Sequence, residues 1–183
     1  MLGDLIVDGN SIYTTDSLTG AVYRYDIAAD TFTVMVESGV LRSPQGLVLS
    51  ESGAGLYVAD YAEGLFYLSF ADGQLDRLQV DEGITDYGVD GLYRFGDELI
   101  AIQNGIQPHR VVAFALGKDG RSITAARTLA ANLPAFDEPT LGTVVGRDFY
   151  FVANSHWNRF DRENRLPDGL SGPIVLKIEL AGR

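Results

Sequence analysis

The sequence predicts an all-β fold, and within that class a β-propeller, on three observations. A strand phrase recurs four times and ends at Asp16, Asp60, Asn104 and Asn154, with spacings of 44, 44 and 50 residues. A period of roughly 40–50 residues that holds four short strands is typical of a propeller blade. Tight Gly and Asp turns separate the strands, and no stretch carries a helical period.

Residues 1–183 are therefore expected to form one domain of four consecutive blades, at about 3–38, 44–80, 88–130 and 138–181. Alternating apolar residues between turn signals define the strands. We expect the first blade to hold Asp4–Asp8, Ser11–Asp16, Ala21–Ile27 and Thr31–Glu37. We expect the second to hold Gly46–Leu49, Gly55–Asp60, Gly64–Phe70 and Gln74–Val80. The third would contain Val89–Phe95, Glu98–Asn104, Arg110–Leu116 and Ser122–Leu129.

The fourth blade is expected to lack its outer strand. Its strands are Leu141–Val145, Asp148–Asn154 and Pro173–Leu180, and only three residues follow them. Closed propellers often complete such a blade from the opposite terminus, but only three residues precede the first strand. This indicates the C-terminal four blades of a longer ring, or association with a second copy through the open blade edges. We favour the longer ring.

The net charge and the lack of cysteine limit the kinds of partner and chemistry that the chain is expected to support. The chain carries 14 basic and 25 acidic residues, for a net charge of −11. This balance argues against binding to nucleic acid or to anionic membranes, whose phosphates require Lys and Arg. The absence of cysteine excludes thiol catalysis, disulfides and cysteine-zinc sites.

Loop lengths predict which end of the ring is functional. The turns inside the hairpins are short at one end, whereas the blade-to-blade connections and the long loop Ser155–Gly172 gather at the other. At that end Gln45, Asp90 and Glu138 precede the innermost strands, and Asn104 ends a second strand. A polar channel mouth that takes a small-molecule ligand follows from this placement.

Several polar residues at this end have a purely structural alternative. Asp16 and Asp60 end equivalent strands, where Asx side chains commonly bond the backbone of the next turn. His109 and His156 could act as bases or metal ligands, but loop packing or solvation is the favoured interpretation. Trp157 could line a substrate pocket or could pack the long loop onto the ring.

The blade openings Ser43-Pro44-Gln45-Gly46-Leu47 and Gly88-Val89-Asp90-Gly91-Leu92 resemble those of the senescence-marker-protein, gluconolactonase and luciferin-regenerating-enzyme-like family. The endings Leu56-Tyr57-Val58-Ala59-Asp60, Gln103-Asn104-Gly105 and Ala153-Asn154-Ser155-His156-Trp157 are similar too, as is Ala135-Phe136-Asp137-Glu138-Pro139-Thr140. The resemblance covers nearly the whole chain and implies six-bladed propellers, of which this sequence represents the last four blades.

The resemblance also implies a divalent cation, typically Ca²⁺, near the channel axis. Carried over by motif, Asp90 matches the family's Asp ligand, while Gln45 stands where the family has Asn. The family's first-blade Glu has no counterpart here, so we expect weak binding. Asn104 and Glu138 are further oxygen donors around the same opening.

Two function classes follow. One is a metal-dependent hydrolase of the lactonase or esterase type, in which a metal-polarised carbonyl is attacked by water. The other is a non-catalytic propeller scaffold, similar to the NHL-repeat proteins, that binds a small ligand or a protein partner at its loop face.

Overall fold

The computed structural model describes residues 2–163 and 165–181 and confirms the all-β propeller architecture. Four sheets, antiparallel except for one short edge strand, follow one another along the chain, and we number them blades 1 to 4. Blade 1 consists of β1 (Leu2–Asp8), β2 (Ser11–Asp16), β3 (Ala21–Asp26) and β4 (Thr31–Val36). Blade 2 consists of β5 (Pro44–Leu49), β6 (Gly55–Asp60), β7 (Gly64–Ser69) and β8 (Leu75–Arg77).

Blade 3 consists of β10 (Val89–Phe95), β11 (Glu98–Gln103), β12 (Arg110–Leu116) and β13 (Ser122–Ala131), with β9 (Gln79–Val80) added at its outer edge. Blade 4 has the three expected strands, β14 (Gly142–Val145), β15 (Asp148–Val152) and β16 (Val175–Glu179). A 3-10 turn, η1 (Trp157–Arg159), lies in its long loop. No helix in the described part of the chain has the length and apolar character needed to cross a membrane.

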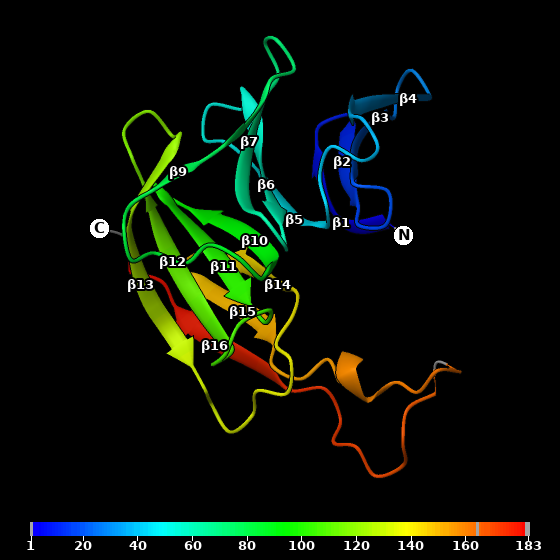
Figure 1. Cartoon of the computed structure of the whole chain (residues 1–183), viewed down its shortest axis with the longest axis vertical. Coiled ribbons are helices and arrows are strands. Elements are labelled where there is room, and N and C mark those ends of the chain that lie inside the picture. Colours follow the sequence, from blue (N-terminus) through cyan, green and yellow to red (C-terminus); the bar gives the residue numbers. More distant parts are fainter. Residues whose placement is uncertain (1, 164, 182–183) are drawn as a thin grey trace.

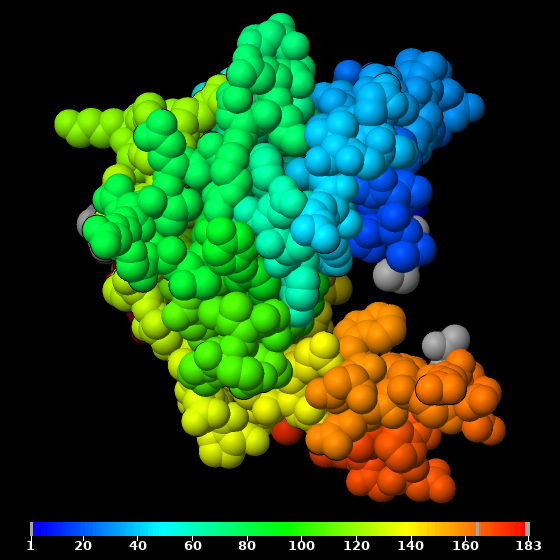
Figure 2. All heavy atoms as spheres, in the orientation of Figure 1, coloured from blue at the N-terminus to red at the C-terminus, as the bar shows by residue number. Residues whose placement is uncertain are grey.

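The first strand of each blade faces a common axis. The inner strands β1, β5, β10 and β14 together line a hollow of about 300 Å³, which marks the channel. Figure 1 shows the four sheets following one another from blade 1, in blue, to blade 4, in orange and red, with an open sector between blade 1 and the long loop of blade 4. In Figure 2 this sector is a notch between the N-terminal blade and the long loop of blade 4.

Apolar side chains fill the three interfaces between successive blades. Tyr13, Val22, Leu47 and Leu56 join blades 1 and 2. A second cluster around Leu65, Leu92, Leu99 and Phe114 joins blades 2 and 3. A third, which contains Ile100, Val111, Phe149 and Phe151, joins blades 3 and 4. Each blade is thus held by its neighbours, which fixes the inner strands relative to one another.

One expected strand is wrong. The segment Gln74–Val80 does not form a single outer strand: β8 pairs with β7, and β9 pairs in parallel with β13 of blade 3. Leu78 separates them, since its side chain is buried between blades 2 and 3 and its N–H donates to the Leu65 carbonyl at 2.9 Å. The chain therefore crosses from one blade to the next, where β9 covers the outer edge of β13.

A register shift at the start of the first hairpin shapes the mouth end of blades 1, 2 and 3. It falls between Leu2 and Leu5, between Pro44 and Leu47, and between Val89 and Leu92. In blade 2 a glycine is required there, because a Cβ on Gly46 would lie 2.4 Å from the Leu92 nitrogen. These bulges position Gln45 and Asp90 at the same height on neighbouring blades.

Candidate functional site

The mouth of the channel brings together the four residues that the sequence singled out for a metal. Gln45, Asp90, Asn104 and Glu138 line one hollow of about 300 Å³, with Ser43, Tyr61 and Trp157. An adjoining hollow of about 190 Å³ shares Gln45, Asp90 and Trp157 and extends to Asp4, Thr140 and Leu141. Their role as metal ligands stays a prediction.

Asp90 is the most constrained of these side chains. Its Oδ2 accepts a hydrogen bond from Thr140 Oγ1 at 2.7 Å and from Asn104 Nδ2 at 2.8 Å. Burial raises the pKa of Asp90, and these two donors counteract part of that rise. The carboxylate is therefore held in one orientation with Oδ2 occupied.

Asn104 positions Asp90. Its Nδ2 also donates to the Pro139 carbonyl at 3.0 Å, and its Oδ1 accepts from the Tyr61 hydroxyl at 3.0 Å. With both ends of the amide engaged, Asn104 links blade 2 to the loop that enters blade 4.

Gln45 and Glu138 use part of their polar groups for local structure. Gln45 Nε2 donates to Ser43 Oγ at 3.2 Å. Glu138 has a left-handed backbone, with φ of 61°, and its Oε2 accepts from the Asn158 N–H at 2.8 Å. The Glu138 carbonyl accepts from Ser155 Oγ at 2.9 Å. Glu138 therefore ties the long loop to the mouth.

Gln45, Asp90 and Glu138 have the types of side chain that bind a hard cation. No hydrogen bond between described residues reaches Gln45 Oε1, Asp90 Oδ1 or Glu138 Oε1, so each keeps one oxygen for a ligand. Carboxylate and amide oxygens are the donors that Ca²⁺ prefers. Residues 2–163 and 165–181 contain no group of three or more His, Cys, Asp or Glu placed to hold a metal.

Sequence reasoning missed Asp4. This side chain lies on β1 in the hollow that also contains Asp90. Burial raises the pKa of Asp4 to about 6, and the negative charge of Asp90 adds to the rise. The internal repeat contains a signal for Asp4. When the blades are aligned on the bulge of their first strands, Asp4 occupies the position at which blades 2 and 3 have Gly46 and Gly91. Asp4 is the candidate general base of the mouth.

The structural interpretation of the other Asp residues is confirmed. Asp16 Oδ1 accepts from the N–H groups of Leu18 and Thr19. Asp60 Oδ1 accepts from Ala62 and Glu63, and its Oδ2 accepts from Arg42 and Ser43. Both therefore stabilise strand ends.

His109 lies near the surface, whereas His156 packs inside the long loop. His109 is partly exposed and contacts Gln107. His156 is buried, with Nδ1 3.2 Å from Asp137 Oδ2 and Nε2 3.1 Å from both Asn154 Nδ2 and the Ser171 carbonyl oxygen. It thus joins the two ends of the long loop. Trp157 lies next to it, is 58% exposed and lines both mouth hollows.

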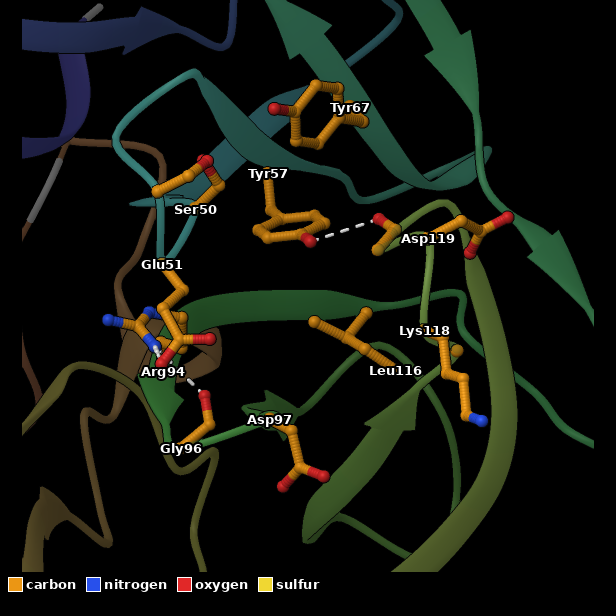
Figure 3. A pocket seen from close by; sticks show the side chains of 13 residues that line it. Ser50, Glu51, Tyr57, Tyr67, Arg94, Gly96, Asp97, Leu116, Lys118 and Asp119 are labelled. Carbon is orange, nitrogen blue, oxygen red and sulfur yellow. Dashed lines mark hydrogen bonds and ion pairs between the residues drawn. The ribbon is translucent and has the colours of Figure 1, made fainter.

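A larger hollow, of about 420 Å³, lies at the opposite end between blades 2 and 3. Figure 3 shows Tyr57, Tyr67 and Leu116 lining it, with Arg94 and Glu51 on one side. Some of its polar groups have local partners: the Tyr57 hydroxyl donates to the Gly120 carbonyl, and Arg94 lies 3.9 Å from Glu51. We place the candidate site at the mouth because the half-buried carboxylates of Asp4 and Asp90 share a hollow there.

No family model and no curated protein matches this chain. Solved structures do. A candidate gluconolactonase has a TM-score of 0.64 at 10% identity, over 86% of this chain and 57% of its own. An auxiliary nutrient binding protein from Bacteroides thetaiotaomicron has a TM-score of 0.64 at 14% identity, over 83% and 42%. A candidate 6-phosphogluconolactonase from Bacteroides uniformis has a TM-score of 0.57 at 16% identity, over 98% and 55%.

The chain shares the propeller fold of gluconolactonase-like proteins. At these identities the likeness concerns the fold alone, and the chain spans 42% to 57% of the length of these three proteins. The residues of the mouth must therefore carry any argument about chemistry.

Proposed function

We propose that this chain carries the site of a metal-dependent hydrolase of the lactonase or esterase type, which opens a small lactone at the channel mouth. The observation that carries the proposal is the pair of half-buried carboxylates, Asp4 and Asp90, which line one hollow with Trp157 and where burial first and the charge of Asp90 second raise the pKa of Asp4. The fold shared with a candidate gluconolactonase supports it.

Asp90 and Gln45 would hold a divalent cation, with Glu138 beside them, through the oxygens left without a hydrogen bond. When bound, the cation supplies a Lewis acid that polarises the substrate carbonyl. Asn104 and Thr140 keep Asp90 in the required orientation.

Asp4 acts as the general base. With a pKa of about 6 it is ionised at neutral pH and takes a proton from a water molecule. That water forms a bond to the acyl carbon, the acyl C–O bond breaks, and Asp4 returns the proton to the departing ring oxygen. Trp157 offers an exposed aromatic face against which the substrate ring packs.

The test is proton release from a panel of γ- and δ-lactones, glucono-δ-lactone included, with Ca²⁺ present. We expect Asp4→Asn to lower kcat at least 100-fold. The matched control Asp97→Asn, at the opposite end of the channel, leaves kcat unchanged. Absence of turnover by the unmodified chain with every lactone would contradict the hydrolase.

A scaffold that binds a ligand without turnover is the second candidate. The 58% exposure of Trp157, whose ring lies 5.5 Å from that of Phe160, favours it, and a nutrient binding protein shares the fold. Trp157 is the one tryptophan of the chain, so its fluorescence reports on the mouth. Saturable quenching by a lactone that is not hydrolysed would favour the scaffold.

A further inference from the structure

Tyr93 is a half-buried tyrosine of the channel whose hydroxyl proton has no acceptor in the described part of the chain. It lies on β10 and lines the channel hollow together with Asp4 and Gly142. Its Oη accepts a hydrogen bond from the Gly142 N–H at 2.6 Å. A phenol has one proton to donate, and no hydrogen bond between described residues uses that of Tyr93. The hydroxyl therefore keeps a donor for a ligand in the channel.

Neighbouring residues hold the Tyr93 hydroxyl in one position. The Tyr93 ring packs against the Phe149 ring, with centroids 5.1 Å apart. A Cβ on Gly91 would lie 2.7 Å from the Tyr93 Oη, so this glycine leaves room for the hydroxyl beside the bulge. A donor fixed in this way is preorganised, which is the condition under which a hydrogen bond stabilises charge that develops during a reaction.

The internal repeat shows that the blade architecture does not require a hydroxyl at this position. Counted from the bulge of the first strand, Tyr93 corresponds to Ile6 of blade 1 and to Val48 of blade 2. Both of these residues are aliphatic. A hydrophobic side chain therefore suffices to build the position, and the polar end of Tyr93 is available for another role.

The electrostatic environment keeps Tyr93 protonated. Burial raises the pKa of Tyr93, the negative charge of Asp4 adds to the rise, and the hydrogen bond from the Gly142 N–H counteracts part of it. A neutral phenol donates a hydrogen bond, so Tyr93 is neither a base nor a nucleophile. Because Tyr93 and the candidate base Asp4 line one hollow, a lactone that reaches Asp4 can also meet this donor.

We propose that Tyr93 is a catalytic residue whose hydroxyl donates a hydrogen bond to the ring oxygen of the lactone, the oxygen that leaves when the acyl C–O bond breaks. This inference rests on the proposed hydrolase. Gln45 and Asp90 lie at the mouth, whereas Tyr93 lies further along the channel, and Asp4 lines both hollows. A lactone with its carbonyl oxygen toward Gln45 and Asp90 therefore directs its ring oxygen to Tyr93.

The donor acts on the departing oxygen without giving up its proton. Water attacks the acyl carbon and passes a proton to Asp4. The acyl C–O bond then breaks, and its electron pair stays on the ring oxygen, where the Tyr93 hydrogen bond stabilises the developing negative charge. Asp4 returns the proton to this oxygen, and the product is the hydroxy acid. The need for Tyr93 is greatest when the leaving oxygen is a basic alkoxide.

Two six-membered lactones that differ in their leaving oxygen test the proposal. δ-Valerolactone releases an alkoxide, whereas dihydrocoumarin releases a more acidic phenol that needs less stabilisation. With Ca²⁺ present, we expect Tyr93→Phe to lower kcat about 100-fold for δ-valerolactone but about tenfold or less for dihydrocoumarin. The matched control is Tyr57→Phe, whose hydroxyl donates to the Gly120 carbonyl at the opposite end of the channel, and it should leave both rates unchanged. Equal losses with both lactones would make Tyr93 a structural residue and overturn the proposal, while the hydrolase would stand.

A binding measurement separates this proposal from the proposed hydrolase. If the unmodified chain turns over neither lactone, the hydrolase fails, and quenching of the single tryptophan, Trp157, by δ-valerolactone reports binding instead. We then expect Tyr93→Phe to raise the Kd about fivefold, since one hydrogen bond to the ring oxygen is lost. Circular dichroism checks that the variant is folded. The same Kd for Tyr93→Phe and the unmodified chain, or no binding at all, would overturn the donor.

Discussion

The two ends of the channel are built from the same four blades but differ in what their polar groups do. At the turn end, short hairpin loops leave a wider hollow whose acidic side chains are exposed, and the Tyr57 hydroxyl donates there to the Gly120 carbonyl. At the mouth, bulges and long connections hold Asp4 and Asp90 half-buried in one hollow, where partial burial first and the charge of Asp90 second raise the pKa of Asp4 to about 6. Hollow size alone would favour the turn end as the site, whereas the carboxylates held in an unfavourable environment favour the mouth.

The largest difference in stability between the two ends is expected when an ion pair is removed from each. Near the mouth, Asp86 is 1% exposed, lies 2.7 Å from Arg77 Nη1 and accepts from the Leu65 N–H. Asp86→Ala removes the acceptor of the buried Leu65 N–H and the partner of the half-buried Arg77 guanidinium, and it should cost about 3 kcal/mol in the free energy of unfolding.

The matched change at the turn end is Asp76→Ala, which removes the exposed pair between Asp76 and Arg121. It should cost less than about 1 kcal/mol. Urea denaturation of both variants measures the contrast. Equal losses would show that the mouth is no more tightly built than the turn end.

Replacement of a glycine by alanine at each end should also lower stability by different amounts. At Gly46 a Cβ would lie 2.4 Å from the Leu92 nitrogen and 2.6 Å from the Asp90 carbonyl oxygen, so Gly46→Ala should cost about 3 kcal/mol. Gly96, at the turn end, has a φ of 61° and open space around it, so Gly96→Ala should cost only about 1 kcal/mol. Thermal unfolding compares them, and a Gly46→Ala protein as stable as the Gly96→Ala protein would refute the tight bulge.

The pH dependence of stability tests Asp4. Its folded pKa of about 6 lies above the unfolded value, so ionising it opposes folding and stability falls as pH rises from about 4 to 6. Asp4→Asn should therefore raise the free energy of unfolding above pH 6, by roughly 2–3 kcal/mol at most, with no gain below pH 4. Denaturation is measured in EDTA, with Asp97→Asn as the control. A gain that does not depend on pH would contradict the assignment.

A hydrogen bond between neutral groups at the turn end should contribute little to stability. Tyr57→Phe removes the hydroxyl that donates to the Gly120 carbonyl at 3.0 Å and should cost about 1 kcal/mol. Activity at the mouth should be unchanged. A loss of lactone turnover in Tyr57→Phe would show that the turn end affects activity at the mouth, and it would contradict the separation of the two ends.

Most strands could be predicted because alternation and glycine turns are local signals. The segment Gln74–Val80 could not, since its split depends on burial of Leu78 and on pairing with Ser122 of the next blade. In the site, Gln45 and Asp90 stand in recognisable blade openings. Asp4 was missed because it replaces a glycine of the repeat, and the orientation of Asn104 depends on Tyr61 of a neighbouring blade.

Calorimetric titration of Ca²⁺ into the unmodified chain and into Asp90→Ala tests the central claim that the mouth is the functional end. We expect weak, saturable heat from the unmodified chain, because three oxygens of Gln45, Asp90 and Glu138 remain for a cation. Asp90→Ala should lose it, while Asp97→Ala at the turn end should retain it. Equal heats from Asp90→Ala and the unmodified chain would contradict the account.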